Sequence, residues 1–182
     1  MQILRVSSFL FTLLVCLSCA SKKEEIPIGL LVGNRAPEFS GKTPTDSLIS
    51  LSSLQGKVVL LDFWASWCGP CRRENRNLIQ TVEKFSTKKF PGKKRKPTKG
   101  FIVFNISLDK SKDAWTNAIR QDQLNWPYHI SELQQWNGNI SNLYRVNSIP
   151  SNYLIDARGV ILARNLRGEM LDQFLEEYSI KD

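Results

Sequence analysis

Two runs of apolar residues dominate the pattern of hydrophobic and polar positions. Residues 58–63 are apolar except for Asp62, and residues 101–108 read FIVFNISL. Runs of this kind favour strands buried on both faces, so we predict strands over residues 57–64 and 101–108. Apolar residues at helical spacing between them predict a first long helix: Leu78, Ile79, Val82 and Phe85. The alternation of strand and helix predicts a parallel sheet.

Shorter patterns predict elements on both sides of this unit. Turn residues at 41–44 and Asp46, followed by LISL at 48–51, indicate a short N-terminal strand or hairpin. A turn of helix is expected near residues 52–54. Ser111 can cap a second helix, whose apolar face carries Ala114, Trp115, Ala118 and Ile119.

The C-terminal third is less regular. Residues 124–136 show no clear period, and Pro127 indicates an edge or a loop. We predict a short helix over residues 140–144 and a hairpin whose turn lies at residues 156–159. A final helix is indicated by a stripe of apolar residues: Met170, Leu171, Phe174, Leu175 and Tyr178.

Positive charge is concentrated in one stretch. The chain has 25 Lys and Arg against 17 Asp and Glu, a net charge of +8, and residues 88–99 hold seven of the basic residues and no acid. With Pro91, Gly92 and Pro97, residues 86–100 predict an exposed loop without regular structure. One basic loop does not indicate a nucleic-acid-binding protein. A solvated loop is the simplest interpretation, and contact with anionic lipid headgroups or an acidic partner is the alternative.

The N-terminus has the pattern of a targeting segment. Arg5 is the only charge in the first 21 residues, and residues 6–17 form an apolar core. This core is short for a membrane span and suits a signal peptide. The sequence LSCA at 17–20 is similar to a bacterial lipoprotein cleavage site, in which the cysteine, here Cys19, becomes the lipidated first residue. Cys16 departs from that pattern, because leucine usually stands three residues before the lipidated cysteine.

These patterns divide the chain into three parts. We predict a lipoprotein-type signal peptide over residues 1–18, a tether over residues 19–33 and one folded domain over residues 34–182. Plain secretion and an uncleaved anchor are the alternatives to lipidation at Cys19.

The four cysteines form two Cys-x-x-Cys pairs, Cys16/Cys19 and Cys68/Cys71. Two such pairs can bind zinc, but the first lies in the apolar leader, where no folded site is expected. Cys68 and Cys71 are then the only internal thiols of the mature chain. The pair therefore indicates thiol–disulfide exchange rather than a structural staple.

The position of Cys68 explains how it could react. It precedes a predicted helix with Pro70 in the first turn, where proline costs no hydrogen bond. Unpaired N–H groups and the helix dipole there stabilise a thiolate and lower a thiol pKa from about 8.5 toward about 7. Cys71 lies on the same side of the helix and can resolve a mixed disulfide.

Five short stretches carry a family resemblance. DFWASWCGPC at 62–71 resembles the active-site segment of the thioredoxin superfamily, and IPSNYLID at 149–156 resembles its proline loop and following strand. APEF at 36–39, LSSLQGK at 51–57 and CRRE at 71–74 are similar to the membrane-tethered TlpA and ResA branch. The resemblance implies an α/β, thioredoxin-like fold: a mixed central sheet flanked by helices, with an N-terminal strand or hairpin extension and a Lys-rich loop insert. Arg76 departs from the family, which usually has a proline there.

The resemblance also implies site residues. Asp62 matches a buried acid that serves Cys71 as a base, and Glu74 matches a carboxylate near the dithiol of ResA-like proteins. A water-facing Asp62 and a solvated Glu74 are the alternatives. Substrate contacts are expected from Trp67, Gly69, Pro70 and the Ile149 carbonyl, with Pro150 as a cis proline. Trp64 should pack in the core and His129 should be structural.

The leading functional hypothesis is a thiol:disulfide oxidoreductase outside the cytoplasm, anchored to a membrane. The resemblance implies protein clients such as apocytochrome c and a membrane electron donor. It implies no cofactor besides the redox-active disulfide and no metal. Gly69 and Pro70 form the dipeptide of reducing thioredoxins and favour a reductant.

Other functions are possible on this sequence. The same dithiol could oxidise or isomerise client disulfides. A peroxidase of the peroxiredoxin type usually needs a hydroxyl residue and a proline at positions that here hold Ala65 and Leu61. A binding module that keeps the fold for protein contacts would not need an intact dithiol and proline loop.

Overall fold

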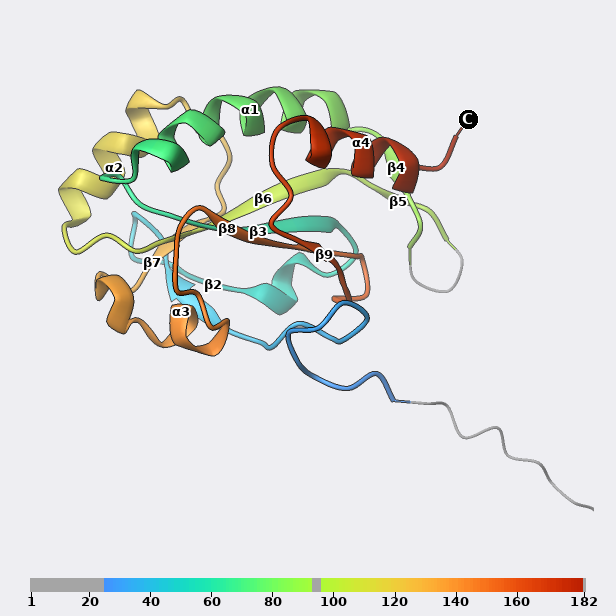
Figure 1. The fold of residues 1–182 in the computed structure, drawn as a ribbon, viewed down its shortest axis with the longest axis horizontal. Helices are drawn as coiled ribbons and strands as arrows, with labels where there is room; N and C mark the ends of the chain where they lie inside the picture. The colour runs from blue at the N-terminus through green and yellow to red at the C-terminus, as the bar shows by residue number, and fades with distance from the viewer. Residues whose placement is uncertain (1–24, 93–95, 182) are drawn as a thin grey trace, which may run out of the picture.

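A seven-stranded mixed sheet forms the centre of the molecule, with helices on both faces (Figure 1). The computed structural model describes residues 25–92 and 96–181. The strand order is β2-β1-β7-β6-β3-β8-β9. This architecture confirms the expected thioredoxin-like α/β fold. None of the helices in the described ranges is long and apolar enough to span a membrane.

The strand β3 (Val58–Trp64) lies inside this sheet, and all seven of its residues are buried. It pairs in parallel with β6 (Phe101–Ser107) and antiparallel with β8 (Ser151–Ile155). Both long strands therefore form where the apolar runs predict them. The helix α1 (Gly69–Phe85) connects β3 to the insert that precedes β6. The parallel pairing follows from that crossover.

Alternate residues of β3 enter two separate hydrophobic layers. Val58 and Leu60 face α1 and α4 (Glu169–Tyr178), where they pack with Leu78, Phe85, Leu171 and Leu175. Residues 59, 61 and 63 face the opposite layer with Phe39, Phe104, Tyr144 and Tyr153. That layer lies on the side of η1 (Leu51–Leu54) and α3 (Asn139–Leu143). Asp62 is two residues from Leu60, so its side chain points to the same face of the sheet, toward α1.

The shorter predicted elements are also present. The N-terminal hairpin consists of β1 (Ser40–Lys42) and β2 (Leu48–Ser50). The hydroxyl of Ser111 accepts a hydrogen bond from the Ala114 N–H and caps α2 (Lys112–Gln121). The C-terminal hairpin joins β8 to β9 (Ile161–Arg164).

Two segments differ from the sequence-based expectation. The segment without a clear period contains β7 (His129–Ser131), which is an interior strand between β1 and β6, and η3 (Gln135–Asn137). Pro127 precedes β7 and so costs the sheet no hydrogen bond. A strand of three residues, such as β7, is too short to show the alternation of apolar and polar side chains that predicts a strand.

The basic stretch is not entirely irregular. Its ends pair as β4 (Lys89–Phe90) and β5 (Thr98–Lys99). Phe90 is fully buried and stacks on Tyr178 with ring centroids 6.1 Å apart. This apolar anchor holds the base of the insert against α4, although polar residues surround it in sequence. The prediction that Met170 belongs to the buried apolar stripe of α4 is also wrong, because its side chain is exposed.

Candidate active site

A disulfide joins Cys68 to Cys71 at the N-terminus of α1. Cys68 is the N-cap residue, and its Sγ accepts a hydrogen bond of 3.2 Å from the Cys71 N–H. Cys68 is 5% exposed and Cys71 is 1% exposed. Cys68, the slightly more exposed of the two cysteines, therefore lies at the positive end of the helix dipole. Gly69 and Pro70, between the two cysteines, are exposed.

The loop between β3 and Cys68 is fixed by a carboxylate that the sequence analysis did not identify. The backbone N–H and hydroxyl of Ser66 donate to Asp109 over 3.0 and 2.5 Å. Asp109 also accepts a hydrogen bond of 2.7 Å from the Ser107 hydroxyl. Asp109 is buried just beyond the end of β6. In the sequence, the only sign of its structural role is that this acid directly follows an apolar run. These hydrogen bonds hold the loop that precedes Cys68 against the end of β6.

Arg72 ties the start of α1 to α2. Its Nε and Nη2 donate to the two carboxylate oxygens of Asp122 over 2.5 and 2.7 Å. Its Nη1 donates to the Ser66 carbonyl over 3.2 Å. A guanidinium that binds a carboxylate with two parallel bonds is a rigid connection. Only the tertiary structure reveals it, because the two partners are 50 residues apart.

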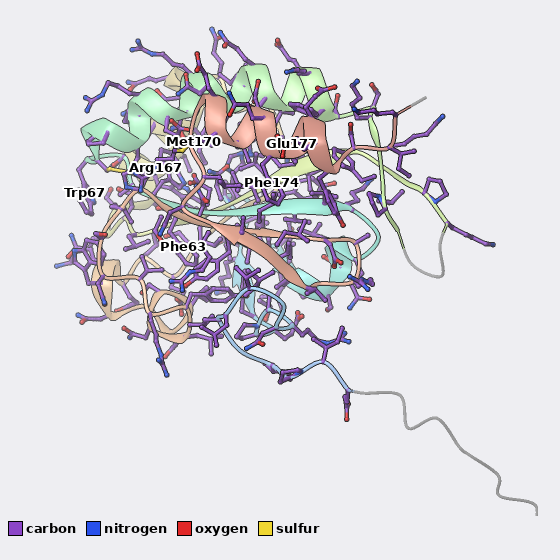
Figure 2. The ribbon with its side chains drawn as sticks, turned by 45° about the vertical axis from the view of Figure 1, so that its right-hand side comes forward. Phe63, Trp67, Arg167, Met170, Phe174 and Glu177 are labelled. Atoms are coloured by element: carbon purple, nitrogen blue, oxygen red, sulfur yellow. A yellow bond between two sulfur atoms is a disulfide. The ribbon has the colours of Figure 1, made fainter. Side chains whose placement is uncertain are left out.

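The proline loop reaches the same edge of the sheet as the disulfide. Ser151 of β8 pairs with Phe63 near the end of β3, so Pro150 lies beside the loop that leads to Cys68. The Ile149–Pro150 peptide bond is cis. Arg167 donates a hydrogen bond from Nη2 to the Pro150 carbonyl. Trp67 and Arg167 lie at one end of the molecule (Figure 2).

Asp62 is buried in the sheet beneath α1, with 2% of its surface exposed. Asn105 and Asn152 are its register partners on β6 and β8, and the Asn105 amide donates to its Oδ2 over 2.9 Å. Burial raises the pKa of Asp62 to about 7, and the negative charge of Glu74 adds to the rise. The Asn105 hydrogen bond and the positive charge of Arg167 oppose it. Asp62 can therefore gain or lose a proton near neutral pH.

Glu74 is half-buried and hydrogen-bonded through both carboxylate oxygens. Oε1 accepts from the Gly168 N–H and Oε2 from the Asn77 amide, each over 2.9 Å. Its charge acts on Asp62, as the raised pKa of that residue shows. Glu74 is thus part of a network that joins α1, the start of α4 and the buried acid. This placement does not fit a freely solvated side chain.

An aromatic pair lies next to the disulfide. Trp67, which precedes Cys68, is 51% exposed, and its ring centroid lies 6.2 Å from that of Trp136. Trp136 is 41% exposed and belongs to η3, within the segment that showed no period in the sequence. Trp64 is fully buried, as expected.

Several predicted features lie elsewhere. The signal peptide over residues 1–18, Cys19 and the three basic residues 93–95 fall outside the described residues. His129 is buried, and its Nε2 lies 3.2 Å from the Leu124 carbonyl. In the described ranges, no cluster of three or more His, Cys, Asp or Glu side chains could hold a metal ion.

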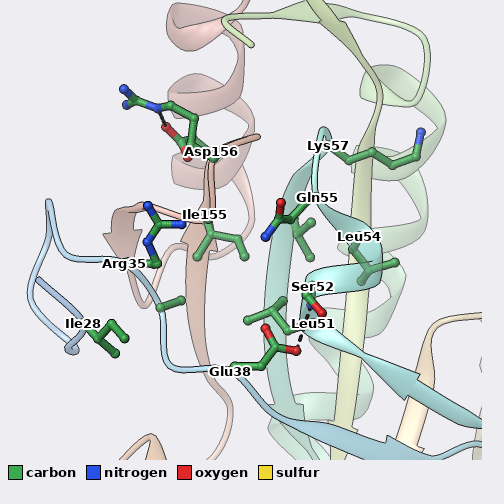
Figure 3. Close-up of a pocket in the computed structure, with 14 residues that line it drawn as sticks. Ile28, Arg35, Glu38, Leu51, Ser52, Leu54, Gln55, Lys57, Ile155 and Asp156 are labelled. Carbon is green, nitrogen blue, oxygen red and sulfur yellow. Dashed lines mark hydrogen bonds and ion pairs between the residues drawn. The ribbon is translucent and has the colours of Figure 1, made fainter. Parts of the chain in front are cut away.

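A cavity of about 90 Å³ lies at the opposite end of β3 from the disulfide (Figure 3). Lys57 and Val59 at the start of β3 contribute to its lining. A hydrogen bond of 3.0 Å from the Ser52 N–H to Glu38 joins two of its walls. None of the predicted site residues lines it.

Comparison with known proteins assigns the family. Residues 32–164 match the AhpC/TSA family. The chain belongs to this family. It is 35% identical over 142 residues to the thioredoxin-like protein YneN of Bacillus subtilis (strain 168), covering 78% of this chain and 73% of YneN. It is 29% identical over 158 residues to the thiol-disulfide oxidoreductase ResA of Bacillus cereus (strain ATCC 10987 / NRS 248), covering 87% and 80% of the two chains.

Solved structures agree with this family assignment. The thioredoxin domain of a thiol-disulfide oxidoreductase from Bacteroides vulgatus has a TM-score of 0.71 and 28% identity, over 84% of this chain and 100% of that domain. A thiol-disulfide oxidoreductase from Bacteroides fragilis NCTC 9343 has a TM-score of 0.67 and 30% identity, over 79% and 98%. The AhpC/TSA member described here is thus a thioredoxin-like thiol-disulfide oxidoreductase of the TlpA and ResA type, and its relatives imply protein thiols or disulfides as substrates.

Proposed function

We propose that this protein reduces disulfides of client proteins outside the cytoplasm while tethered to a membrane. The observation that carries the proposal is the Cys68–Cys71 disulfide at the N-terminus of α1, with the second sulfur buried and a buried acid of raised pKa beneath the helix.

The reaction balances over two exchange steps. The Cys68 thiolate attacks one sulfur of the client disulfide, forms a mixed disulfide and releases the other client sulfur as a thiolate, which takes a proton from solvent. Cys71 then loses its proton and attacks Cys68, so that the Cys68–Cys71 bond forms and the second client sulfur leaves. The client gains two electrons and two protons, and the dithiol loses them.

Asp62 is the base that we assign to Cys71. Its pKa of about 7 lets a carboxylate accept the thiol proton near neutral pH, since such proton transfer is efficient when the pKa lies near the operating pH. Glu74 acts with it, because its negative charge raises the proton affinity of Asp62.

The client is expected to bind across the exposed end of the motif. Trp67, Gly69 and Pro70 present accessible surface around Cys68. The Ile149 carbonyl on the adjacent proline loop would accept a backbone hydrogen bond from an extended client segment. Pro150 would orient that carbonyl toward the bound chain.

The direction, compartment and anchor are proposals with separate support. Gly69 and Pro70 match the dipeptide of reducing thioredoxins, which supports a reductant. The apolar leader at residues 6–17 and Cys19 support export and lipidation, with the tether holding the domain near the membrane. A reductant in an oxidising compartment needs electrons from elsewhere, so we propose a membrane electron donor that regenerates the dithiol.

Peroxide reduction is less well supported. Ala65 is buried and offers no hydroxyl at the place where a peroxidase usually carries one. Disulfide exchange therefore remains the function that the site supports best.

Two measurements test the proposal. Cys71→Ser should trap a mixed disulfide with a reducible client protein, whereas Cys68→Ser should trap none. Equilibration of the full chain with dithiothreitol should give a potential near the thioredoxin value of about −270 mV. A value near about −120 mV would make the protein an oxidant, and a pair with no reversible couple would favour a binding module.

A further inference from the structure

A chain of two hydrogen bonds ends on the buried acid. The indole Nε1 of Trp126 donates to Asn105 Oδ1 over 2.7 Å. The Asn105 Nδ2 donates to Asp62 Oδ2 over 2.9 Å. Asn105 is completely buried on β6, so water does not compete for its amide. These two hydrogen bonds connect the segment between α2 and β7 to the active site.

The direction of each hydrogen bond is dictated by chemistry. An indole N–H can only donate, so the group that faces it must be the amide oxygen of Asn105. The amide nitrogen then faces Asp62 and can only donate to it. A flipped amide would place two donors against each other at Trp126. Trp126 therefore sets the orientation of Asn105, and Asn105 requires that Asp62 Oδ2 accept.

Trp126 is itself held in place. Its ring stacks on His129, with centroids 5.8 Å apart and an interplanar angle of 16°. His129 is the register partner of Asn105 on β7, and the Asn105 N–H donates to the Tyr128 carbonyl over 2.9 Å. The indole is thus fixed on one side of the amide by strand pairing and ring stacking.

We propose that Trp126 and Asn105 are positioning residues that keep Asp62 Oδ2 as an acceptor and confine the exchangeable proton of Asp62 to Oδ1. The proposal rests on the proposed role of Asp62 as the base for Cys71. When Asp62 takes up a proton, Oδ2 remains occupied by the Asn105 donor. Oδ1, the oxygen that the Asn105 amide does not contact, is then the atom that exchanges the proton.

The other charged groups around Asp62 act on it through their charge and do not determine which of its two carboxylate oxygens carries the proton. Glu74 approaches from α1 and Arg167 from the segment before α4, and both act through their charge. His129 lies beyond Asn105, and burial lowers its pKa to about 4, so it is neutral at pH 7. Asn105 is the residue whose side chain donates a hydrogen bond to the Asp62 carboxylate.

Trp126→Phe tests the proposal directly, because it keeps an aromatic ring against His129 and removes the indole donor. The amide can then rotate, and Asp62 loses a fixed donor that favours its charged form. The proton affinity of Asp62 should rise about threefold to tenfold. The carboxyl carbon of Asp62, followed by NMR against pH in the oxidised full chain, reports this affinity without any assay of activity.

Trp115→Phe is the matched control. Trp115 is a buried tryptophan on α2 whose Nε1 has no hydrogen-bond partner among the described residues. The same substitution there should leave the titration of Asp62 unchanged. An equal shift in both variants, or no shift in Trp126→Phe, would overturn the proposal.

Two further variants separate this inference from the proposed function. Asn105→Ala should raise the proton affinity of Asp62 at least as much as Trp126→Phe, and Trp126→Phe keeps the test valid if the buried Asn105 variant does not fold. In an Asp62→Asn background, Trp126→Phe should no longer alter the pH dependence of mixed-disulfide resolution. If Asp62→Asn alone leaves resolution unchanged, the proposed base is wrong, while the NMR titration still decides the positioning.

Discussion

Glu74 Oε1 accepts a hydrogen bond of 2.9 Å from the backbone N–H of Gly168. Gly168 is the N-cap residue of α4, so this bond ties α1 to the start of the last helix. The same carboxylate raises the pKa of Asp62 by its charge. One side chain thus combines a mechanical and an electrostatic connection, and the two can be separated by substitution.

Glu74→Gln should separate them, because glutamine keeps an oxygen for Gly168 and loses the charge. The pKa of Asp62 should fall, so the pH at which mixed-disulfide resolution reaches half its maximal rate should move to a lower value. Stopped-flow kinetics between pH 5 and 9 would measure this. Glu74→Ala removes the tie as well and should cost about 1 kcal/mol of unfolding free energy, against little for Glu74→Gln. Equal pH profiles in wild type and Glu74→Gln would contradict the electrostatic role.

Asp62→Asn should change how stability depends on pH. The pKa of Asp62 is raised from 3.8 to about 7 by burial in the folded protein, so the folded state holds the proton more tightly than the unfolded state. The free energy of unfolding that Asp62 contributes is therefore fully present below pH 4 and is lost as pH rises toward 7. The loss is at most about 4 kcal/mol.

Denaturant unfolding of the oxidised protein at pH 4 and pH 8 would measure this effect. Asp62→Asn should be more stable than the wild type at pH 8, and the difference should shrink at pH 4. Other titrating groups contribute to both curves, so the comparison between the two proteins isolates Asp62. A difference that does not change with pH would show that Asp62 is not held neutral by the fold.

Trp67→Ala should weaken client binding with little effect on the redox couple. Trp67 is exposed beside Cys68, and its loss removes apolar contact area while the tie between Ser66 and Asp109 remains. We expect KM for a protein disulfide to rise severalfold, with a change in unfolding free energy within about 0.5 kcal/mol. Leu48→Ala removes an exposed apolar residue at the β2 edge of the sheet and is the control. If both variants raise KM equally, the effect does not belong to the site.

Phe90→Ala should destabilise the protein without changing its reduction potential. Phe90 is fully buried where the basic insert meets α4, and truncation of such a ring costs about 3–5 kcal/mol. The insert follows the C-terminal end of α1, whereas the disulfide lies at the N-terminal end (Figure 1). Phe90→Leu should cost less, because it leaves a smaller cavity. A shift of the potential in Phe90→Ala, measured against dithiothreitol, would show that the insert is coupled to the dithiol.

Elements with a strong local pattern were predictable from the sequence. Residues 58–63 and 101–108 carry enough consecutive apolar side chains to require burial on both faces, and Ser111 caps its helix by a contact three residues away. By contrast, β7 has three residues, and its pairing with β1 and β6 depends on strands more than 20 residues away in sequence. Such an element has no local period to detect.

The sequence by itself determined the reaction class, because the spacing of Cys68 and Cys71 and the helix that follows them are local features. It also placed Asp62 in a buried strand, which is sufficient to expect a raised pKa. Only the tertiary structure decided what surrounds that acid. Asn105 lies 43 residues from Asp62, and Trp126 a further 21 residues on. Hydrogen bonds between such distant residues exist only once the strands have paired, because no local pattern encodes which donor will face which oxygen.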